Sequence, residues 1–160
     1  MYRPTADICD AHETTAQVCD PLFGDFGGRL EFEGPIVTLE TLEDNSAVRP
    51  ILEEKGQGRV LVIDGAGSTR CALVGGNLAT LAAENGWAGI VVHGCARDAH
   101  ELDEVPLGIK ALALAPRRSE KRGRGTRDVP VSFAGVRFEP GHYLFADRDG
   151  IVVLPERPAD

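Results

Sequence analysis

Long hydrophobic runs are missing from this sequence of 160 residues. No apolar stretch approaches the roughly 20 residues that a membrane-spanning helix needs. The N-terminal segment, MYRPTADICD, has no apolar stretch behind a basic one, so it lacks the pattern of a secretory signal. We therefore expect neither a membrane protein nor a secreted one.

Cysteine is scarce, and its spacing is uninformative for metal or disulfide chemistry. The four cysteines, Cys9, Cys19, Cys71 and Cys95, form no CxxC pair and no disulfide-scaffold spacing. This pattern argues against a structural zinc knuckle and favours a reducing cytoplasmic location.

Positive charge is in the minority, with 17 Lys and Arg against 25 Asp and Glu and a formal net charge of -8. We therefore expect no binding to a nucleic-acid backbone. The exception is the basic stretch Arg117–Arg127, RRSEKRGRGTR, which has no interleaved aromatic residues. It is either a solvated, mobile loop or a docking site for an acidic partner.

A hydrophobic content of 42% is enough for one domain spanning residues 1–160 without disulfide bonds. We expect a helix from Thr5, as its N-cap, to about Glu13. Gly34-Pro35 separates two alternating segments, residues 29–33 and 36–42, which predicts a hairpin. A second helix is expected from Asn45 or Ser46 to Lys55, ending at Gly56.

The middle of the chain alternates buried strands with helices. The expected strands are Arg59–Ile63, Ala88–His93 and Ile109–Ala115, and the expected helices between them are Leu78–Glu84 and Ala99–Glu104. This order favours right-handed crossovers and a partly parallel sheet. Four short strands separated by glycine and proline follow, near Val129–Phe133, Val136–Phe138, Tyr143–Ala146 and Ile151–Leu154. The predicted fold class is therefore mixed α/β, with helices covering part of a mixed sheet.

Two segments that follow strands carry candidate chemistry, since functional groups in such folds gather beyond the carboxyl ends of strands. The first is Gly75-Gly76-Asn77-Leu78, at the start of a helix. Two glycines there allow a tight turn, and the free amides with the helix dipole could bind a carboxylate. The alternative is an ordinary turn.

The second segment contains Arg97, Asp98 and Glu101. The Arg97 guanidinium could hold a carboxylate or an enolate oxygen. Asp98 offers hard oxygen ligands for Mg²⁺ or Mn²⁺, and Glu101 would share its face if the stretch is helical. The alternative is an exposed helix start with Asp98 as an ordinary N-cap.

The spacing of these residues resembles a family signature. Gly76, twenty residues, Arg97-Asp98, two residues and Glu101 are similar to the G-x20-R-D-x2-E/D motif of the class II 4-hydroxy-4-methyl-2-oxoglutarate aldolases. That family also includes the regulator of ribonuclease activity A, and is termed RraA-like. The resemblance extends over nearly the whole chain, through CDPLFGDFGGRLEFEGPIVTLETLEDN, GRVLVIDGAGSTRCALVGGNLA and FADRDGIVVLPE.

The resemblance implies a swivelling β/β/α-type fold, a homotrimer and a divalent metal cofactor, Mg²⁺ or Mn²⁺. The amides of Gly75 to Leu78 would hold the carboxylate of a small 2-oxo acid substrate. Arg97 would bind the 2-oxo and carboxylate end, and Asp98 would ligate the metal. The implied activity is cleavage to pyruvate, with oxaloacetate decarboxylation as a second activity. The alternative is a non-catalytic regulator that binds a protein such as ribonuclease E.

Three other patterns carry less weight. Lys110 is the only lysine in an apolar setting, and we expect it to point to solvent rather than form a Schiff base. His93, Cys95, Asp98 and His100 superficially resemble transition-metal ligands; His93 and Cys95 would share a strand face, but His100 lies on the next element. The loop at residues 64–68, DGAGS, is similar to a nucleotide or adenosylmethionine loop without its usual acidic partner.

Overall fold

The computed structural model describes residues 2–160. Ten strands form one mixed sheet, in the order β1-β12-β11-β3-β4-β6-β7-β2, with β5 paired to β6 and β8 paired to β3. A separate two-stranded sheet consists of β9 and β10. The strands are β1 Gln17–Val18, β2 Gly24–Asp25, β3 Phe32–Glu40, β4 Val60–Asp64, β5 Ala72–Val74, β6 Gly89–Ala96, β7 Gly108–Leu114, β8 Thr126–Arg127, β9 Val131–Phe133, β10 Val136–Phe138, β11 Tyr143–Asp147 and β12 Gly150–Leu154. The mixed α/β fold class predicted from the sequence is confirmed.

The centre of the sheet is parallel, because β3, β4, β6 and β7 run in one direction. The segments VLVID and GIVVHGCA supply β4 and β6 and are almost entirely buried. Strands buried on both faces need such continuous apolar runs rather than alternation. The helices that connect these strands are α2 Val48–Leu52, α3 Gly76–Glu84 and α4 Ala99–Glu104.

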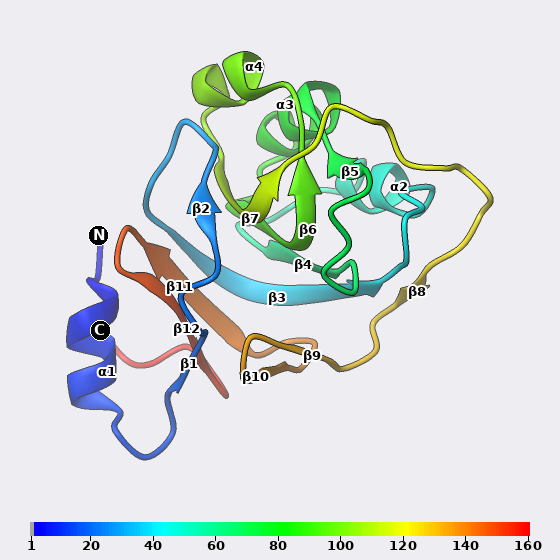
Figure 1. The fold of residues 1–160 in the computed structure, drawn as a ribbon. Helices are drawn as coiled ribbons and strands as arrows, with labels where there is room; N and C mark the ends of the chain where they lie inside the picture. The colour runs from blue at the N-terminus through cyan, green and yellow to red at the C-terminus, as the bar shows by residue number, and fades with distance from the viewer. Residues whose placement is uncertain (1) are drawn as a thin grey trace.

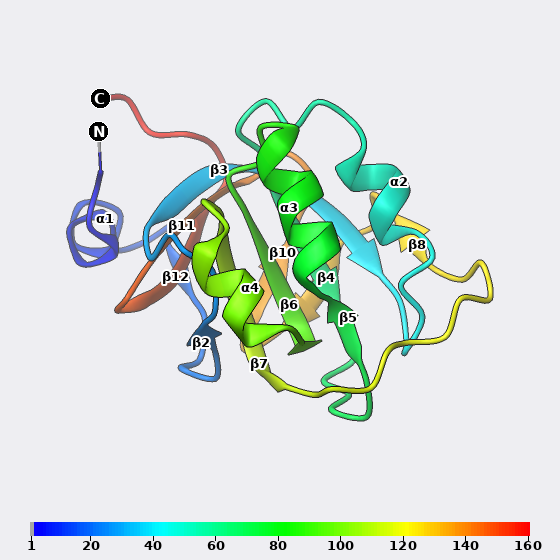
Figure 2. The same cartoon turned by 90° about the horizontal axis from the view of Figure 1, so that it is seen from above.

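Helices α2, α3 and α4 cover one face of the parallel strands (Figure 1). Seen from above, α3 and α4 lie side by side over the sheet (Figure 2). A hydrophobic core that includes Leu61, Ile63, Ala79 and Leu102 fills the space between the helices and the sheet. Because α3 begins directly after the parallel strand β5, its amino end lies at the edge where the parallel strands end.

The opposite face is covered by the β9–β10 hairpin, whose Phe133 and Phe138 stack at 4.4 Å between ring centroids. The helix α1, Thr5–Ala11, packs on β11 and β12 and buries a third, smaller cluster. The first described residues and the last residues of the chain lie near each other beside α1 (Figure 1), and Arg3 lies 3.7 Å from Asp160. No helix in residues 2–160 is long and apolar enough to cross a membrane.

The hairpin predicted at Gly34-Pro35 is wrong. Residues 32–40 form the single strand β3, which pairs with β11 up to Pro35 and with β4 from Ile36. A proline fits at this change of partner because it cannot donate to a continuous ladder. Gly34 is required here, since a Cβ atom would lie 2.0 Å from the carbonyl oxygen of Gly58.

Two predicted helices are shorter than expected. Helix α1 ends at Ala11, and Pro4 is its N-cap rather than Thr5. Helix α2 begins at Val48 because Asp44 makes a turn with Ser46, accepting hydrogen bonds from its amide at 2.8 Å and from its hydroxyl. The strands at residues 17–18, 24–25, 72–74 and 126–127 are too short to show a pattern in the sequence.

Candidate functional site

The two segments singled out in the sequence meet in the structure. Strands β5 and β6 are parallel neighbours, with Ala72 opposite Cys95. The chain leaves β5 at Gly75 and leaves β6 at Arg97, so both segments emerge at the same edge of the sheet. The amide of Gly76 donates a hydrogen bond to the carboxylate of Asp98 at 2.9 Å.

The glycines make this close approach possible. A Cβ atom on Gly75 would lie 2.8 Å from Oδ2 of Asp98 and 3.3 Å from Cγ of Arg97. A Cβ atom on Gly76 would lie 1.9 Å from Oε2 of Glu101. The side chains of Arg97, Asp98 and Glu101 thus lie directly over the turn that begins α3.

The amino end of α3 retains free hydrogen-bond donors. Gly75 is the N-cap, and its carbonyl accepts from the amide of Ala79 at 3.0 Å. The amides of Asn77 and Leu78 belong to the first turn, where an α-helix has no acceptor of its own to offer. They can bind a carboxylate there, whereas the Gly76 amide is taken by Asp98.

Asp98 does not cap its own helix. It occupies the N-cap position of α4 with φ 67° and ψ 49°, and its side chain makes no capping hydrogen bond. One carboxylate oxygen accepts from Gly76, and no hydrogen bond within residues 2–160 involves the other. The exposed Asp98 therefore has an oxygen available to a cation.

The donor set suits a hard cation that keeps most of its water. No group of three His, Cys, Asp or Glu side chains within residues 2–160 could enclose a metal ion. Mg²⁺ and Mn²⁺ are commonly held by one or two carboxylates together with water and substrate oxygens. Asp98 fits that mode of binding, and no all-protein cage is present in the part of the chain that the structure describes.

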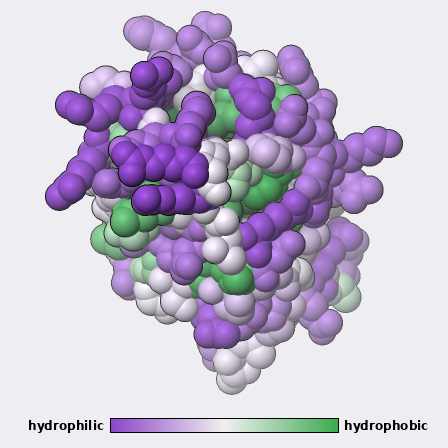
Figure 3. All heavy atoms as spheres, turned by 90° about the vertical axis from the view of Figure 1, so that its right-hand side faces the viewer, coloured by the Kyte–Doolittle hydropathy of each residue, from purple (hydrophilic) through white to green (hydrophobic). Residues whose placement is uncertain are grey.

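A cleft of about 600 Å³ opens beside these groups, between α2, α3 and the segment that follows β7. Gly75, Asn77, Leu78, Arg97 and Asp98 all contribute to its lining. The half-buried Arg97 also donates to the carbonyl of Pro116 at 3.4 Å, which directs its guanidinium toward that segment. The face of the molecule that includes α2 and the segment after β7 is covered largely by hydrophilic side chains (Figure 3).

The basic stretch forms one wall of this cleft, a role that its composition did not reveal. Its side chains are mostly exposed, but its backbone is anchored to buried Asp44. The Asp44 carboxylate accepts from the amides of Arg122 at 2.6 Å and Arg124 at 3.4 Å. Burial alone would raise the pKa of Asp44, but these bonds and those from Ser46 outweigh it and lower the pKa to about 2.

A second hollow, of about 660 Å³, lies near the chain ends and is lined by Arg3, Glu33 and Tyr143. Its polar groups satisfy one another. Arg3 pairs with Glu33 at 2.9 Å, and the Tyr143 hydroxyl donates to Glu33 at 2.7 Å. The cleft at Asp98 is the stronger candidate because the amides of Asn77 and Leu78 and one oxygen of Asp98 remain free.

The expectation that Lys110 points to solvent is wrong. Lys110 is 2% exposed, and its ammonium lies 2.8 Å from a carboxylate oxygen of Asp25 and 2.6 Å from the carbonyl oxygen of Asp147. A lysine in an apolar strand can be buried when its charge is paired with a carboxylate and hydrogen-bonded. Lys110 is not among the residues that line the cleft.

The glycine loop at residues 64–68 is held against β6 by hydrogen bonds to His93. The amides of Gly65 and Gly67 both donate to the carbonyl of His93, at 3.1 and 3.0 Å. They are therefore not available to a phosphate group. The His93 ring stacks on Phe133 at 4.6 Å, and its Nδ1 lies 3.6 Å from Asp64.

Comparison with known proteins gives consistent matches over the whole chain. The family described as RraA-like, Aldolase/RraA, matches residues 5–153. A protein of Alkalilimnicola ehrlichii named "Putative 4-hydroxy-4-methyl-2-oxoglutarate aldolase" is 56% identical over 153 residues, covering 96% of this chain and 95% of its own. A Burkholderia multivorans protein of the same name is 56% identical over 158 residues, covering 96% of each chain.

Solved structures match equally well. The RNA-processing inhibitor RraA from Thermus thermophilis has a TM-score of 0.96 and 50% identity, covering 99% of this chain and 96% of that one. A Geobacillus kaustophilus protein named S-adenosylmethionine: 2-dimethylmenaquinone methyltransferase has a TM-score of 0.95 and 47% identity, covering 97% and 96%. With the signature residues gathered around the start of α3 and this agreement in sequence and fold, the chain belongs to the RraA-like family of aldolases and RraA proteins.

Proposed function

We propose that the protein is a divalent-metal-dependent carbon–carbon lyase that cleaves 4-hydroxy-4-methyl-2-oxoglutarate to two molecules of pyruvate. The observation that supports this most is the meeting of Gly76, Asp98 and Glu101 beside a cleft that Asp98 lines and that has free amide donors. The name shared by relatives that are 56% identical supports the same reaction and substrate.

Each residue has a definite task in the proposed reaction. The amides of Asn77 and Leu78 bind the C1 carboxylate, and Arg97 orients the 2-oxo group. Asp98 would hold Mg²⁺ or Mn²⁺, and Lewis-acid polarisation of the 2-oxo oxygen is the chemistry that such a cation supplies when bound. Glu101 positions a water molecule that accepts the proton of the 4-hydroxyl.

Loss of that proton breaks the C3–C4 bond. The 4-carbon becomes the carbonyl carbon of one pyruvate, and the bonding electrons pass to the enolate of the other. Arg97 stabilises the negative charge as it develops, and protonation of the enolate at C3 completes the second pyruvate. Oxaloacetate would give the same enolate by losing CO₂, so we propose decarboxylation as a second activity of this site.

A coupled lactate dehydrogenase assay tests the proposal with both substrates, with Mg²⁺ or Mn²⁺ and with EDTA. We expect pyruvate release that EDTA abolishes. Asp98→Gly should lose activity by at least about 10³-fold. Glycine accepts the positive φ of this position, so its thermal unfolding should stay close to that of the wild type. Pyruvate release at the wild-type rate by this variant would contradict the role of Asp98.

The proposed homotrimer is measured separately, by light scattering during size-exclusion chromatography. A second candidate function is regulation of a protein such as ribonuclease E, and the name of the Thermus structure, an RNA-processing inhibitor, supports a regulatory role. A stoichiometric complex with purified ribonuclease E, together with no turnover of either 2-oxo acid, would favour the regulator over the lyase.

A further inference from the structure

We propose that Arg49 and Arg118 form a second carboxylate-binding site in the cleft, which selects 2-oxo acids that carry a distal carboxylate. This inference rests on the proposed function, because it concerns the end of the substrate farthest from Asp98. It assigns the cleft to dianionic substrates rather than to 2-oxo acids in general.

The charge of the cleft differs in sign from that of the molecule. The chain has a formal net charge of -8. The residues that line the cleft nevertheless include four basic side chains, Arg49, Arg97, Arg118 and Lys121, and only two acidic ones, Glu53 and Asp98. Two of the four cations would balance Glu53 and Asp98, so the remaining two favour an anion with more than one charge.

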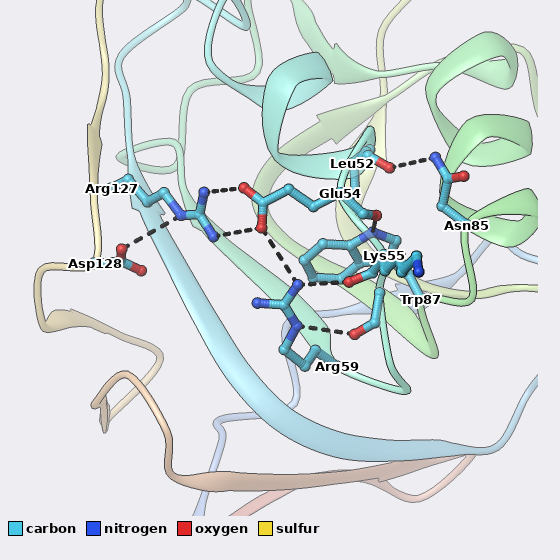
Figure 4. Close-up of polar contacts among 9 residues, drawn as sticks. Leu52, Glu54, Lys55, Arg59, Asn85, Trp87, Arg127 and Asp128 are labelled. Atoms are coloured by element: carbon cyan, nitrogen blue, oxygen red, sulfur yellow. Dashed lines mark hydrogen bonds and ion pairs between the residues drawn. The ribbon is translucent and has the colours of Figure 1, made fainter.

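Arg49 and Arg118 also lack a carboxylate partner, whereas arginines just beyond the cleft have one. Arg127 and Arg59 both bind Glu54 just beyond α2, and Arg59 also lies over the Trp87 ring at 4.7 Å (Figure 4). Within residues 2–160, no carboxylate lies within 4.0 Å of the basic group of Arg49 or Arg118. Their donors are therefore available to a ligand.

Lys121 is less suited to this task. Its ammonium already donates to the side-chain oxygen of Asn45 at 2.9 Å, and Asn45 in turn donates to the carbonyl of Leu73 at 3.1 Å. Lysine also cannot offer the planar pair of donors that a guanidinium presents to a carboxylate.

The backbone places Arg118 about one short strand away from the amino end of α3. Arg118 pairs with Ala72 at the start of β5, whereas Gly75 follows the end of that strand. Three residues of strand span roughly 10 Å, and Arg118 lines the cleft that extends over this length. Arg49 extends from α2 into the same cleft. One carboxylate at Asn77 and Leu78 would thus leave the other near the arginines.

Binding measurements on two ligands of equal length test this. 2-Oxoglutarate carries the distal carboxylate, and 2-oxopentanoate has a methyl group in its place. Calorimetry with Mg²⁺ should show that the wild type prefers 2-oxoglutarate. In Arg49→Gln and Arg118→Gln, the ratio of the two affinities should fall by about fivefold each, as expected for a partly exposed charge-assisted contact.

Arg117→Gln is the matched control. Arg117 is adjacent and exposed, but it does not line the cleft, so its removal changes the net charge equally without touching the site. The affinity ratio should stay within about twofold of the wild type. An equal fall in this control, or an unchanged ratio in Arg49→Gln and Arg118→Gln, would overturn the second site.

The outcome separates the two proposals. If the wild type releases pyruvate from 4-hydroxy-4-methyl-2-oxoglutarate but the arginine variants keep its preference, only the second site is wrong. If the wild type neither binds these 2-oxo acids nor releases pyruvate, the proposed function fails, and the second site fails with it.

Discussion

Asp98 has a left-handed backbone conformation, with φ 67° and ψ 49°. Non-glycine residues rarely adopt it, although Asp tolerates it better than most. In this conformation the carboxylate of Asp98 accepts a hydrogen bond from Gly76 at the start of α3 and does not bind the amides of its own helix, α4. Such conformational cost is often found where a side chain serves binding or catalysis.

Gly76→Ala tests the role of Glu101 without changing Glu101 itself. The new Cβ atom would overlap the Glu101 carboxylate, which lies 1.9 Å from that position, and would displace it. We expect kcat for pyruvate release to fall by about 10²-fold, the typical contribution of proton transfer. Stability should change little, since alanine favours a helix and offsets part of the crowding.

The same variant in a Glu101→Ala background should have a much smaller effect, because both changes remove one group. Thr80→Ala, on the exposed side of α3, serves as the control and should keep wild-type activity. Multiplicative losses in the Gly76→Ala, Glu101→Ala double variant would show that Gly76 acts independently of Glu101.

The segment that follows β7 is held in place by a residue from a distant part of the chain. Its composition predicts a solvated segment, and most of its side chains are exposed. Its backbone, however, depends on Asp44, which is 1% exposed and binds the amides of Arg122 and Arg124. One buried carboxylate thereby positions a wall of the cleft.

Asp44→Ala should release this wall. Trypsin cleaves after Arg and Lys only where the backbone can adapt, so we expect cleavage within residues 117–124 at least about tenfold faster than in the wild type. Mass spectrometry of the fragments over time measures the rate. Asp103→Ala, an exposed carboxylate on α4, provides the control. Equal rates in Asp44→Ala and the wild type would mean that other contacts hold the segment.

At the scale of the whole molecule, Asp147 joins the first residues of the chain to its last hairpin. Its buried carboxylate accepts from the amide of Thr5 at 2.8 Å, the Thr5 hydroxyl at 2.7 Å and the Tyr2 hydroxyl at 2.7 Å. Its carbonyl accepts from Lys110 of β7. Burial would raise the pKa of Asp147, but the hydrogen bonds from Thr5 and Tyr2 outweigh it, and the pKa is lowered.

This lowered pKa predicts how stability depends on pH. A carboxyl group that is more acidic in the folded state stabilises it fully above the unfolded pKa of about 3.9, and the contribution is lost as the pH falls through the folded pKa. Asp44 acts in the same direction. The free energy of unfolding should therefore decline as the pH is lowered from about 5 toward 3.

Asp147→Asn isolates this contribution. At pH 7 it should cost about 2 kcal/mol in urea unfolding, because a neutral amide accepts these bonds more weakly. Its stability should fall less steeply between pH 5 and 3 than that of the wild type. Asp149→Asn, a neighbouring exposed residue, is the control. Parallel pH profiles for Asp147→Asn and the wild type would contradict the assignment.

Several features were predictable from the sequence because they depend on local patterns. The apolar runs of β4 and β6 identify buried parallel strands, and α4 begins and ends at the predicted residues. The Gly76, Arg97, Asp98 and Glu101 spacing indicated the family. Which residues could bind a carboxylate or a cation follows from their chemistry alone.

Tertiary structure decided the rest, because it depends on contacts between distant residues. Gly34-Pro35 has the composition of a turn, yet packing against β11 and β4 keeps β3 extended. Lys110 is buried because Asp25 and the Asp147 carbonyl meet it from other strands. The sequence names the groups that carry the proposed chemistry, but only the parallel pairing of β5 with β6 brings them to one cleft, since no local pattern specifies which strand ends become neighbours.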